Sequence, residues 1–288
     1  MSEILRAENL SFVYGVSTPF EKKAVDSVSF TVNKGEFIGI IGHTGSGKST
    51  LIQMLNGLIT PTSGTVYLNG VDIYKNPKEI RNVRFKVGLV FQYPEHQLFE
   101  ETVYKDIAFG PLNMGIKGEE LDRQVLTAAR FVGLRQELLN KSPFDLSGGE
   151  KRRAAIAGVI AMNPEILILD EPTAGLDPMG KEVLLTQMTE YHKKSGNTVL
   201  LVSHSMEDIA RVADKVLVMN HSSLALFEET RKVFSQGEKL ESMGLRVPQI
   251  TKIMQELNKK GFAFSEGILT VDEAVREILS CLKKEGKL

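Results

Sequence analysis

The chain has 288 residues, of which 42% are hydrophobic and 25% are charged, a composition typical of a globular protein with enough apolar material for a core. Its 35 basic and 36 acidic residues leave a net charge of −1, which argues against a dedicated nucleic-acid-binding protein because such proteins usually carry a basic excess. The single cysteine, Cys281, excludes an internal disulfide.

No segment of the sequence indicates insertion into a membrane. The longest apolar runs, such as residues 166–169, are only a few residues long, whereas a membrane-spanning helix needs about 20. Residues 1–8 mix charged and apolar types and do not resemble a signal peptide. We therefore expect a soluble, cytoplasmic protein that contacts a membrane only through partners.

Five short apolar segments in the first third of the chain have the composition of strands. They are residues 4–14, 24–32, 37–41, 65–68 and 86–91. Between them we predict a helix from Lys48 to about Asn56, ended by Gly57, and a hairpin turn at Asn69-Gly70.

The middle of the chain changes pattern, because residues 101–162 carry only helical periodicity. Strands are expected again at residues 166–169 and 198–202, and helices from Pro178 to about Lys194 and from about Met206. Apolar strands that alternate with helices predict parallel βαβ units. We interpret the helical stretch, about residues 93–162, as a subdomain packed on that α/β core.

The last 50 or so residues form a separate helical extension, predicted over residues 236–288 after a main domain of residues 1–235. Its two apolar helical stripes are Ile250, Ile253, Met254 and Leu257, then Val271, Ala274, Val275, Ile278, Leu279 and Leu282. A small helical cap on the core is the simpler interpretation, and an extra dimerisation surface is the alternative.

A glycine-rich segment between a predicted strand and a predicted helix matches G-x-x-x-x-G-K-[ST]. Its glycines allow backbone N–H groups to surround phosphates, and the helix N-terminus adds its positive end. We expect Lys48 to reach the β- and γ-phosphates and the Ser49 hydroxyl to bind Mg²⁺. The predicted ATP-binding residues here are Gly42, His43, Thr44, Gly45, Ser46, Gly47, Lys48, Ser49 and Thr50.

Two carboxylates, Asp170 and Glu171, follow the apolar strand 166–169. Ligand sites of parallel sheets lie at the carboxyl ends of the strands, so both side chains can face the nucleotide. Asp170 is predicted to hold Mg²⁺, directly or through water. Glu171 is predicted to be the general base that polarises the attacking water, although a solvated surface acid is the plain alternative.

A second phosphate-binding element is predicted at Ser147, Gly148 and Gly149, which begin a helix. Ser147 with Glu150 is also a helix capping box, which by itself explains the serine. A capping box does not require two glycines, however, and their absent side chains leave bare N–H groups at a positive helix end.

With Leu146-Ser147-Gly148-Gly149-Glu150 the chain resembles the ATP-binding-cassette (ABC) family, whose signature ends in glutamine instead of Glu150. The resemblance covers about residues 3–235. It implies an α/β fold, a P-loop NTPase domain of the ABC type with an antiparallel β subdomain and a helical subdomain, here followed by the C-terminal helical extension.

The resemblance also implies roles for four further residues. Tyr14 matches the aromatic residue that stacks on adenine, and Gln92 matches the glutamine that touches Mg²⁺ and reports to the membrane partner. Asp177 matches a loop that crosses a dimer interface, although it also suits a helix N-cap before Pro178. His204 matches the histidine that contacts the γ-phosphate.

The mechanism implied by the family is a head-to-tail pair in which two ATP molecules are sandwiched between two subunits. Each phosphate loop is covered by the Ser147–Gly149 face of the other subunit, so that hydrolysis is linked to separation. Because Glu171 and His204 are both present, we expect this subunit's own site to be competent in hydrolysis.

The segments Gln92–Phe99 and Glu101–Pro111 resemble the ATPase subunits of energy-coupling factor transporters. The segment Thr18–Lys23 and the helical extension resemble the second of their two ATPase types. This implies an importer of vitamins or transition-metal ions. The partners would be a related, non-identical ATPase, a transmembrane coupling protein and a substrate-binding membrane protein, with the chain peripheral at the cytoplasmic face of the cell membrane. A groove for a partner helix is expected at Leu98, Phe99, Val103 and Phe109, although packing inside the helical subdomain explains some of them.

One region departs from the family pattern, because residues 220–223 replace the glycines that many relatives carry in a hairpin, and residues 227–230 replace those before the next helix. We expect Asn220 to supply the turn geometry. Two other functions stay open at this point: a cytosolic ABC ATPase of DNA repair or translation, and a phosphate-loop kinase. The kinase would have no use for Leu146–Glu150.

Overall fold

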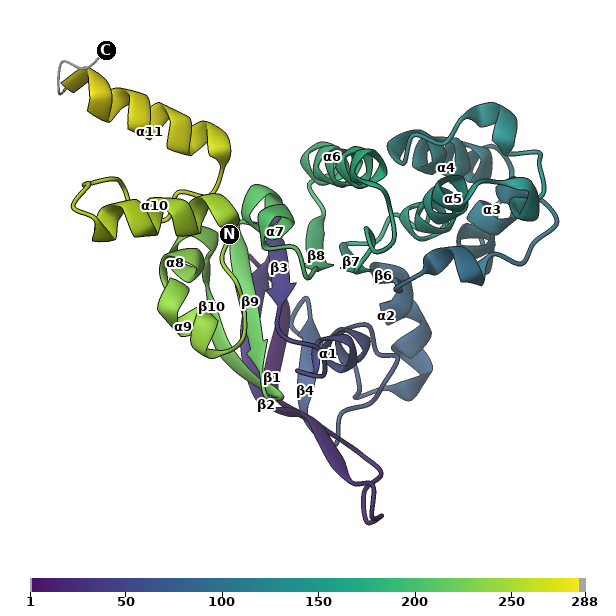
Figure 1. The fold of residues 1–288 in the computed structure, drawn as a ribbon. Coiled ribbons are helices and arrows are strands. Elements are labelled where there is room, and N and C mark those ends of the chain that lie inside the picture. The colour runs from purple at the N-terminus through teal and green to yellow at the C-terminus, as the bar shows by residue number, and fades with distance from the viewer. Residues whose placement is uncertain (1, 285–288) are drawn as a thin grey trace.

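The computed structural model describes residues 2–284, so residues 285–288 of the predicted extension lie outside the described residues. Two sheets form the centre of the molecule (Figure 1). The larger has the strand order β10-β9-β3-β8-β7-β6, and all its neighbouring pairs are parallel except β10 with β9. Its strands are β3 (Phe37–Ile41), β6 (Val87–Val90), β7 (Ile166–Asp170), β8 (Thr198–Val202), β9 (Lys215–Asn220) and β10 (Ser223–Glu229). The predicted parallel α/β core is present.

The smaller sheet is antiparallel and has the order β2-β1-β4-β5. Its strands are β1 (Glu3–Tyr14), β2 (Lys22–Asn33), β4 (Ser63–Leu68) and β5 (Val71–Asp72). Asn69 and Gly70, with φ of 51° and 78°, form the predicted hairpin turn.

Alternate residues of the central strands feed two cores, one on each face of the larger sheet. On β3, Ile38 and Ile40 pack with the antiparallel sheet and the helix after the phosphate loop. Phe37 and Ile41 pack with the helices on the other face. Gly39 lies between them because a Cβ there would approach Ile209 Cγ2 to 2.5 Å. The strands are buried on both faces, as their continuous apolar sequences predict.

Seven α-helices precede β9 in the chain. They are α1 (Lys48–Leu55), α2 (Ile80–Lys86), α3 (Val103–Asn113), α4 (Gly118–Phe131), α5 (Gly148–Ile160), α6 (Pro178–Ser195) and α7 (Met206–Val212). Figure 1 shows α3, α4 and α5 grouped beyond α6, on the side of the molecule opposite α8 and α10. Helix α2 falls between two predicted strands and was not predicted.

The turn between β9 and β10 differs from the expectation. Its positive φ angles belong to His221 (43°) and Ser222 (68°), whereas Asn220 is still part of β9. The prediction that Asn220 supplies the turn geometry was therefore wrong. The hairpin tolerates left-handed non-glycine residues because the Ser222 carbonyl accepts a hydrogen bond from the Asp26 backbone N–H at 2.8 Å, and its hydroxyl donates to the Lys23 carbonyl at 3.0 Å.

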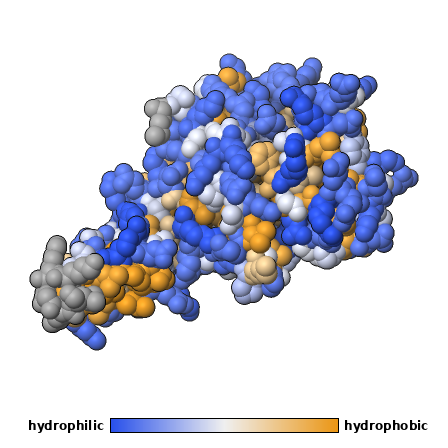
Figure 2. Space-filling view, turned by 90° about the horizontal axis from the view of Figure 1, so that it is seen from above, coloured by the Kyte–Doolittle hydropathy of each residue, from blue (hydrophilic) through white to orange (hydrophobic). Residues whose placement is uncertain are grey.

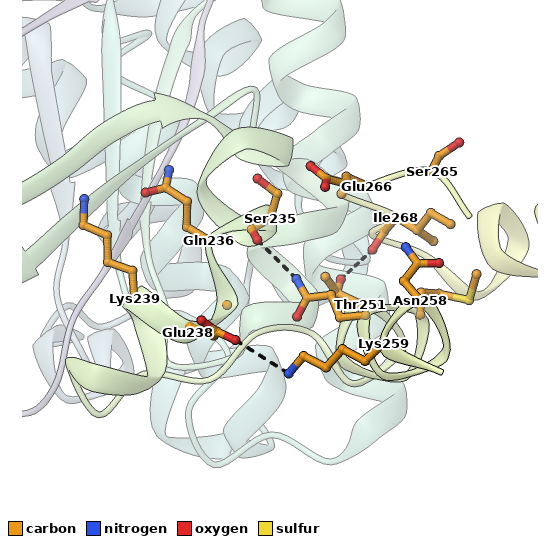
Figure 3. A pocket seen from close by; sticks show the side chains of 14 residues that line it. Ser235, Gln236, Glu238, Lys239, Thr251, Asn258, Lys259, Ser265, Glu266 and Ile268 are labelled. Atoms are coloured by element: carbon orange, nitrogen blue, oxygen red, sulfur yellow. Dashed lines mark hydrogen bonds and ion pairs between the residues drawn. The ribbon is translucent and has the colours of Figure 1, made fainter. Parts of the chain in front are cut away.

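The C-terminal helices are α8 (Thr230–Ser235), α9 (Gly237–Ser242), α10 (Gln249–Lys259) and α11 (Val271–Lys284). Polar contacts join α10 to the residues beside it, around a cleft of about 470 Å³ (Figure 3). The Thr251 hydroxyl donates to the Ile268 carbonyl at 2.5 Å, and Lys259 lies 3.7 Å from Glu238.

The apolar stripe of α11 divides between two environments. Ala274 is buried and Ile278 packs against the small core of the extension. Val271, Val275 and Leu279, four residues apart, are exposed. Figure 2 shows a hydrophobic patch along this arm of the molecule. The extension therefore keeps an uncovered apolar face.

Candidate ATP-binding and hydrolysis site

The phosphate loop connects β3 to α1 and depends on glycine for its shape. Gly42, Gly45 and Gly47 all have positive φ. A Cβ at Gly47 would lie 2.1 Å from the Ala24 carbonyl oxygen, whereas nothing lies within 4 Å of one at Gly45, which leaves room for a ligand. The loop therefore has the form of a phosphate-binding cradle.

Lys48 lies inside this loop. Its Nζ donates to the carbonyls of Gly42 at 2.8 Å and His43 at 3.1 Å, so the loop curls around the ammonium group. Burial lowers the pKa of Lys48, and the nearby Glu171 and Asp170 partly oppose this shift. A buried cation held by neutral carbonyls is prepared to pair with an anionic phosphate.

The catalytic candidates lie at the ends of neighbouring strands. Asp170 ends β7, and burial raises the pKa of its carboxyl group while a hydrogen bond with the Ser49 side chain opposes the rise. Glu171 follows with φ of 48°, and its backbone N–H donates to the Val202 carbonyl at 3.0 Å. Glu171 Oε1 lies 2.7 Å from His204 Nε2, the side chain that follows β8. The strand order thus brings together residues separated by more than 30 positions.

A cavity of about 360 Å³ contains most of the predicted site. Its lining comprises Tyr14, Lys22, Ala24, Thr44, Gly45, Gly47, Lys48, Ser49, Thr50, Gln92, Glu171 and His204. The Tyr14 hydroxyl lies 3.1 Å from Thr50 Oγ1, which fixes the ring at one end of the cavity. Lys22 was missed by sequence reasoning, although it is the residue opposite Tyr14 in the β1–β2 pair.

Three predicted loop residues do not line this cavity. His43 turns its ring away: Nδ1 lies 2.9 Å from the Thr44 carbonyl, and Nε2 accepts a hydrogen bond from the His221 N–H at 3.4 Å. Ser46 is buried, and within residues 2–284 its hydroxyl has no hydrogen-bond partner. Gly42 and His43 line a neighbouring cavity instead.

The Ser147–Gly149 segment lies in a different part of the structure from the phosphate loop. It begins α5 in the helical subdomain and does not line the cavity that holds Lys48. Ser147 and Glu150 form a complete capping box, so the expected helix start is real. A Cβ at Gly148 would meet nothing within 4 Å, which leaves this helix end open to a ligand or partner.

Asp177 caps α6 through a hydrogen bond from the Gly180 N–H to its Oδ1 at 2.9 Å. The N-cap interpretation of this residue is therefore sound within the chain. Asp177 is also exposed, like the neighbouring Met179. A role across a dimer interface stays a prediction.

Arg152 is a structural residue that sequence reasoning missed. Its guanidinium is buried and pairs with Glu95, with Nε at 3.0 Å and Nη2 at 2.6 Å from the two carboxylate oxygens. Nη1 donates to the carbonyls of Pro172 and Ala174. Arg152 on α5 thus joins the segment after Gln92 to the segment after Glu171.

A groove of about 470 Å³ lies on the helical subdomain, and its lining includes Leu98, Phe99 and Phe109. The rings of Phe99 and Phe109 meet edge to face at 5.0 Å, and both are about half exposed. Val103 is fully buried, so core packing explains it and it is not part of the groove surface.

The residues predicted to hold Mg²⁺ fit that ion chemically. Ser49 and Asp170 offer a hydroxyl and a carboxylate already in contact, and Gln92 offers an amide oxygen from the same cavity. Hard oxygen donors of this kind, with few protein ligands, suit Mg²⁺ held together with phosphates. No cluster of three or more His, Cys, Asp or Glu side chains able to hold a metal was found among the described residues.

Comparisons with known proteins show which family the chain resembles. A family model described as ABC transporter matches residues 25–174. The energy-coupling factor transporter ATP-binding protein EcfA2 of Caldanaerobacter subterraneus subsp. tengcongensis is 53% identical over 97% of this chain and 98% of its own length. This chain belongs to the ABC transporter family. Within it, the chain belongs to the energy-coupling factor ATP-binding proteins, and EcfA2 of Bacillus subtilis is 46% identical over 95% of this chain and 100% of its own.

Solved structures show the same fold. The structure of cbiO1 from Clostridium perfringens, described as part of the ABC transporter complex cbiONQ, has a TM-score of 0.75, 36% identity and coverage of 88% of this chain and 100% of that one. A dimeric ATP-binding cassette, MJ0796 bound to ADP and Pi, has a TM-score of 0.71, 26% identity and coverage of 79% and 99%. The predicted family, fold and activity class, an ATPase of ABC transporters, are confirmed. In the part of the chain that can be described, no helix is long and apolar enough to span a bilayer.

Proposed function

We propose that this chain is the ATP-hydrolysing subunit of an energy-coupling factor importer for vitamins or transition-metal ions. It would work at the cytoplasmic face of the membrane, paired with a second, non-identical ATPase and docked on a transmembrane coupling protein that engages a substrate-binding membrane protein. The observation that carries the proposal is the order of strand ends. Neighbouring strands place Lys48, His204, Glu171 and Gln92 around one cavity.

Each site residue has a proposed task in hydrolysis. Tyr14 holds the base, and the phosphate loop with Lys48 binds the phosphates through N–H groups and the ammonium. Mg²⁺, when bound by Ser49 and Asp170, neutralises phosphate charge. Glu171 accepts a proton from the attacking water, and His204, 2.7 Å from Glu171 Oε1, holds the carboxylate in place and meets the terminal phosphate.

The open glycine face at Ser147–Gly149 supports the paired arrangement. This face carries exposed N–H groups at a helix end but does not line its own chain's ATP cavity, so we infer that it covers the cavity of a partner. The description of MJ0796 as dimeric, and of cbiO1 as part of a complex, is consistent with such pairing.

Replacement of the proposed base tests the assignment. We expect Glu171→Gln to retain Mg-ATP binding and to lower steady-state ATPase activity by about 100-fold or more, because the amide cannot accept the proton. Glutamine is isosteric, so the φ of 48° is not a new source of strain. Glu190→Gln on the exposed surface of α6 is the control. ATPase activity of Glu171→Gln near the wild-type value would refute the assignment.

Transport is favoured over DNA repair or translation by the relatives and by the groove at Phe99 and Phe109. Affinity purification from detergent-solubilised membranes, followed by mass spectrometry, tests this choice. We expect membrane proteins and a second cassette to be recovered. Recovery of ribosomes or DNA with no membrane protein would favour the other function.

A further inference from the structure

A second cavity, of about 430 Å³, lies directly beside the ATP cavity. The two cavities share Thr44 and His204 as lining residues, so they meet where the end of the phosphate chain is expected. The outer wall of the second cavity is not part of the ATPase core. It is formed by residues 244–247, in the connection between α9 and α10 of the C-terminal extension, and by Gln249 at the start of α10.

This connection is held firmly against the core. Leu245 and Val247 are buried, and the Leu245 N–H donates to the Leu240 carbonyl at 2.9 Å. The Gln249 N–H donates to Glu207 Oε1 at 3.3 Å, which ties the connection to the first turn of α7, directly after His204. Glu207 is the acidic side chain that lines the cavity, and this hydrogen bond directs it toward the connection.

Arg246 lies between the two buried residues, is itself exposed, and lines the cavity with Thr44 and His204. Among the side chains that the structure describes, its guanidinium has no ion-pair or side-chain hydrogen-bond partner. The backbone of Arg246 is anchored, and its side chain is unpaired and lies beside the phosphate loop. Its positive charge and its planar set of N–H donors suit a phosphate group.

We propose that Arg246 is a further ATP-site residue, which binds the terminal phosphate of the nucleotide from the C-terminal extension. This proposal rests on the function proposed above and adds a contact to the same site. The site would then recognise a triphosphate partly through a residue outside the ATPase core. The docking of the extension would be coupled to the nucleotide that is bound, because His204 and Arg246 would meet the same phosphate from two sides.

Equilibrium binding of Mg-ATP and Mg-ADP to the full chain tests the proposal, at protein concentrations where the chain is monomeric. We expect Arg246→Ala to weaken Mg-ATP binding by about tenfold and to change Mg-ADP binding by less than about twofold, because a charge-assisted contact to the terminal phosphate is lost. Arg246→Lys should recover part of the loss, since it keeps the charge without the fork.

Arg276→Ala is the matched control: Arg276 is an exposed arginine of the same extension, and its Nε bonds the Asp272 carbonyl at 3.2 Å. It should leave both affinities unchanged. Thermal unfolding without nucleotide shows whether Arg246→Ala is folded. Arg246→Lys provides a second measurement if it is not.

Three results would overturn the proposal: equal losses for ATP and ADP, no loss for either, or a defect confined to pairing with a second cassette. The last result would assign Arg246 to a carboxylate of the partner. Failure of the wild-type chain to bind Mg-ATP, or unchanged binding by Lys48→Ala, would instead refute the proposed function of the site.

Discussion

At the scale of single residues, Glu150 is the clearest departure from the family signature. Its carboxylate accepts hydrogen bonds from the Ser147 N–H at 3.0 Å and the Ser147 hydroxyl at 2.7 Å. These bonds from Ser147 lower the pKa of Glu150, so the group is ionised at neutral pH. A negative charge therefore lies at the helix end that we expect to meet a partner's triphosphate.

We predict that Glu150→Gln strengthens ATP-driven pairing by about two- to fivefold. Glutamine preserves the capping box but removes the repulsion, which is modest because the group is near solvent. Sedimentation with Mg-ATP, in a Glu171→Gln background that blocks turnover, measures the effect. Glu137→Gln, an exposed acid of the same subdomain, should have no effect. Weaker pairing of Glu150→Gln would contradict the prediction.

At the scale of elements, Arg152 lies on α5, pairs with Glu95 after β6, and bonds the Pro172 and Ala174 carbonyls after β7. Removal of the guanidinium leaves a partly buried carboxylate and two carbonyls without their partner, which costs far more than loss of a surface pair.

We predict that Arg152→Ala lowers the free energy of unfolding by about 3–5 kcal/mol. Urea unfolding followed by circular dichroism measures it. Arg135→Ala removes exposed ion pairs with Glu137 and Glu150, and should cost less than about 1 kcal/mol. A similar decrease in the free energy of unfolding for the two variants would show that the buried ion pair stabilises the fold no more than an exposed one.

The groove formed by α2, α3, α5 and the residues before α3 leads to a prediction about coupling. Phe99→Glu should abolish substrate uptake by the reconstituted transporter while Mg-ATP affinity stays within about twofold, because a charge would be buried against an apolar partner helix. Leu112→Glu is the control, since Leu112 is exposed on α3 but does not line the groove. Normal uptake by Phe99→Glu would remove the groove from the coupling pathway.

The sequence predicted the positions of the strands that precede the candidate site residues, because each of these strands is short, apolar and buried on both faces. The sequence did not predict the buried ion pair of Arg152 with Glu95, because the local pattern around an arginine in a helix is the same whether its side chain faces solvent or a distant glutamate. It misplaced the positive φ at Asn220, because contacts with Asp26 and Lys23 stabilise the turn at His221 and Ser222. Long-range partners of this kind leave no local pattern.

At the scale of the whole molecule, the chain has two incomplete surfaces. One is the candidate ATP cavity, which the proposed pairing would cover, and the other is the apolar face of α11 formed by Val271, Val275 and Leu279. The simpler interpretation of the extension as a cap explains Ala274 and Ile278 but not this face. We propose that the second ATPase subunit covers both surfaces.

We predict that Leu279→Asp weakens nucleotide-independent pairing with the second ATPase by about tenfold or more, because an unpaired charge would enter an apolar interface. Ser280→Asp places the same charge on an exposed neighbour of the same helix and should change pairing by less than about twofold. Co-sedimentation without nucleotide measures both variants. Equal behaviour of the two would exclude this face from the interface.

The β9–β10 hairpin has a consequence for the transport cycle. His221 bonds the ring of His43 on the phosphate loop, and Ser222 bonds both Asp26 and Lys23 on β2, the strand that also carries Lys22. The hairpin thereby joins the β1–β2 strand pair, which carries the residue proposed to hold the base, to the phosphate loop. In the cycle proposed above, nucleotide would then stay bound to this frame while the paired subunits separate, so mutations in the hairpin would change nucleotide retention without changing the pairing surface.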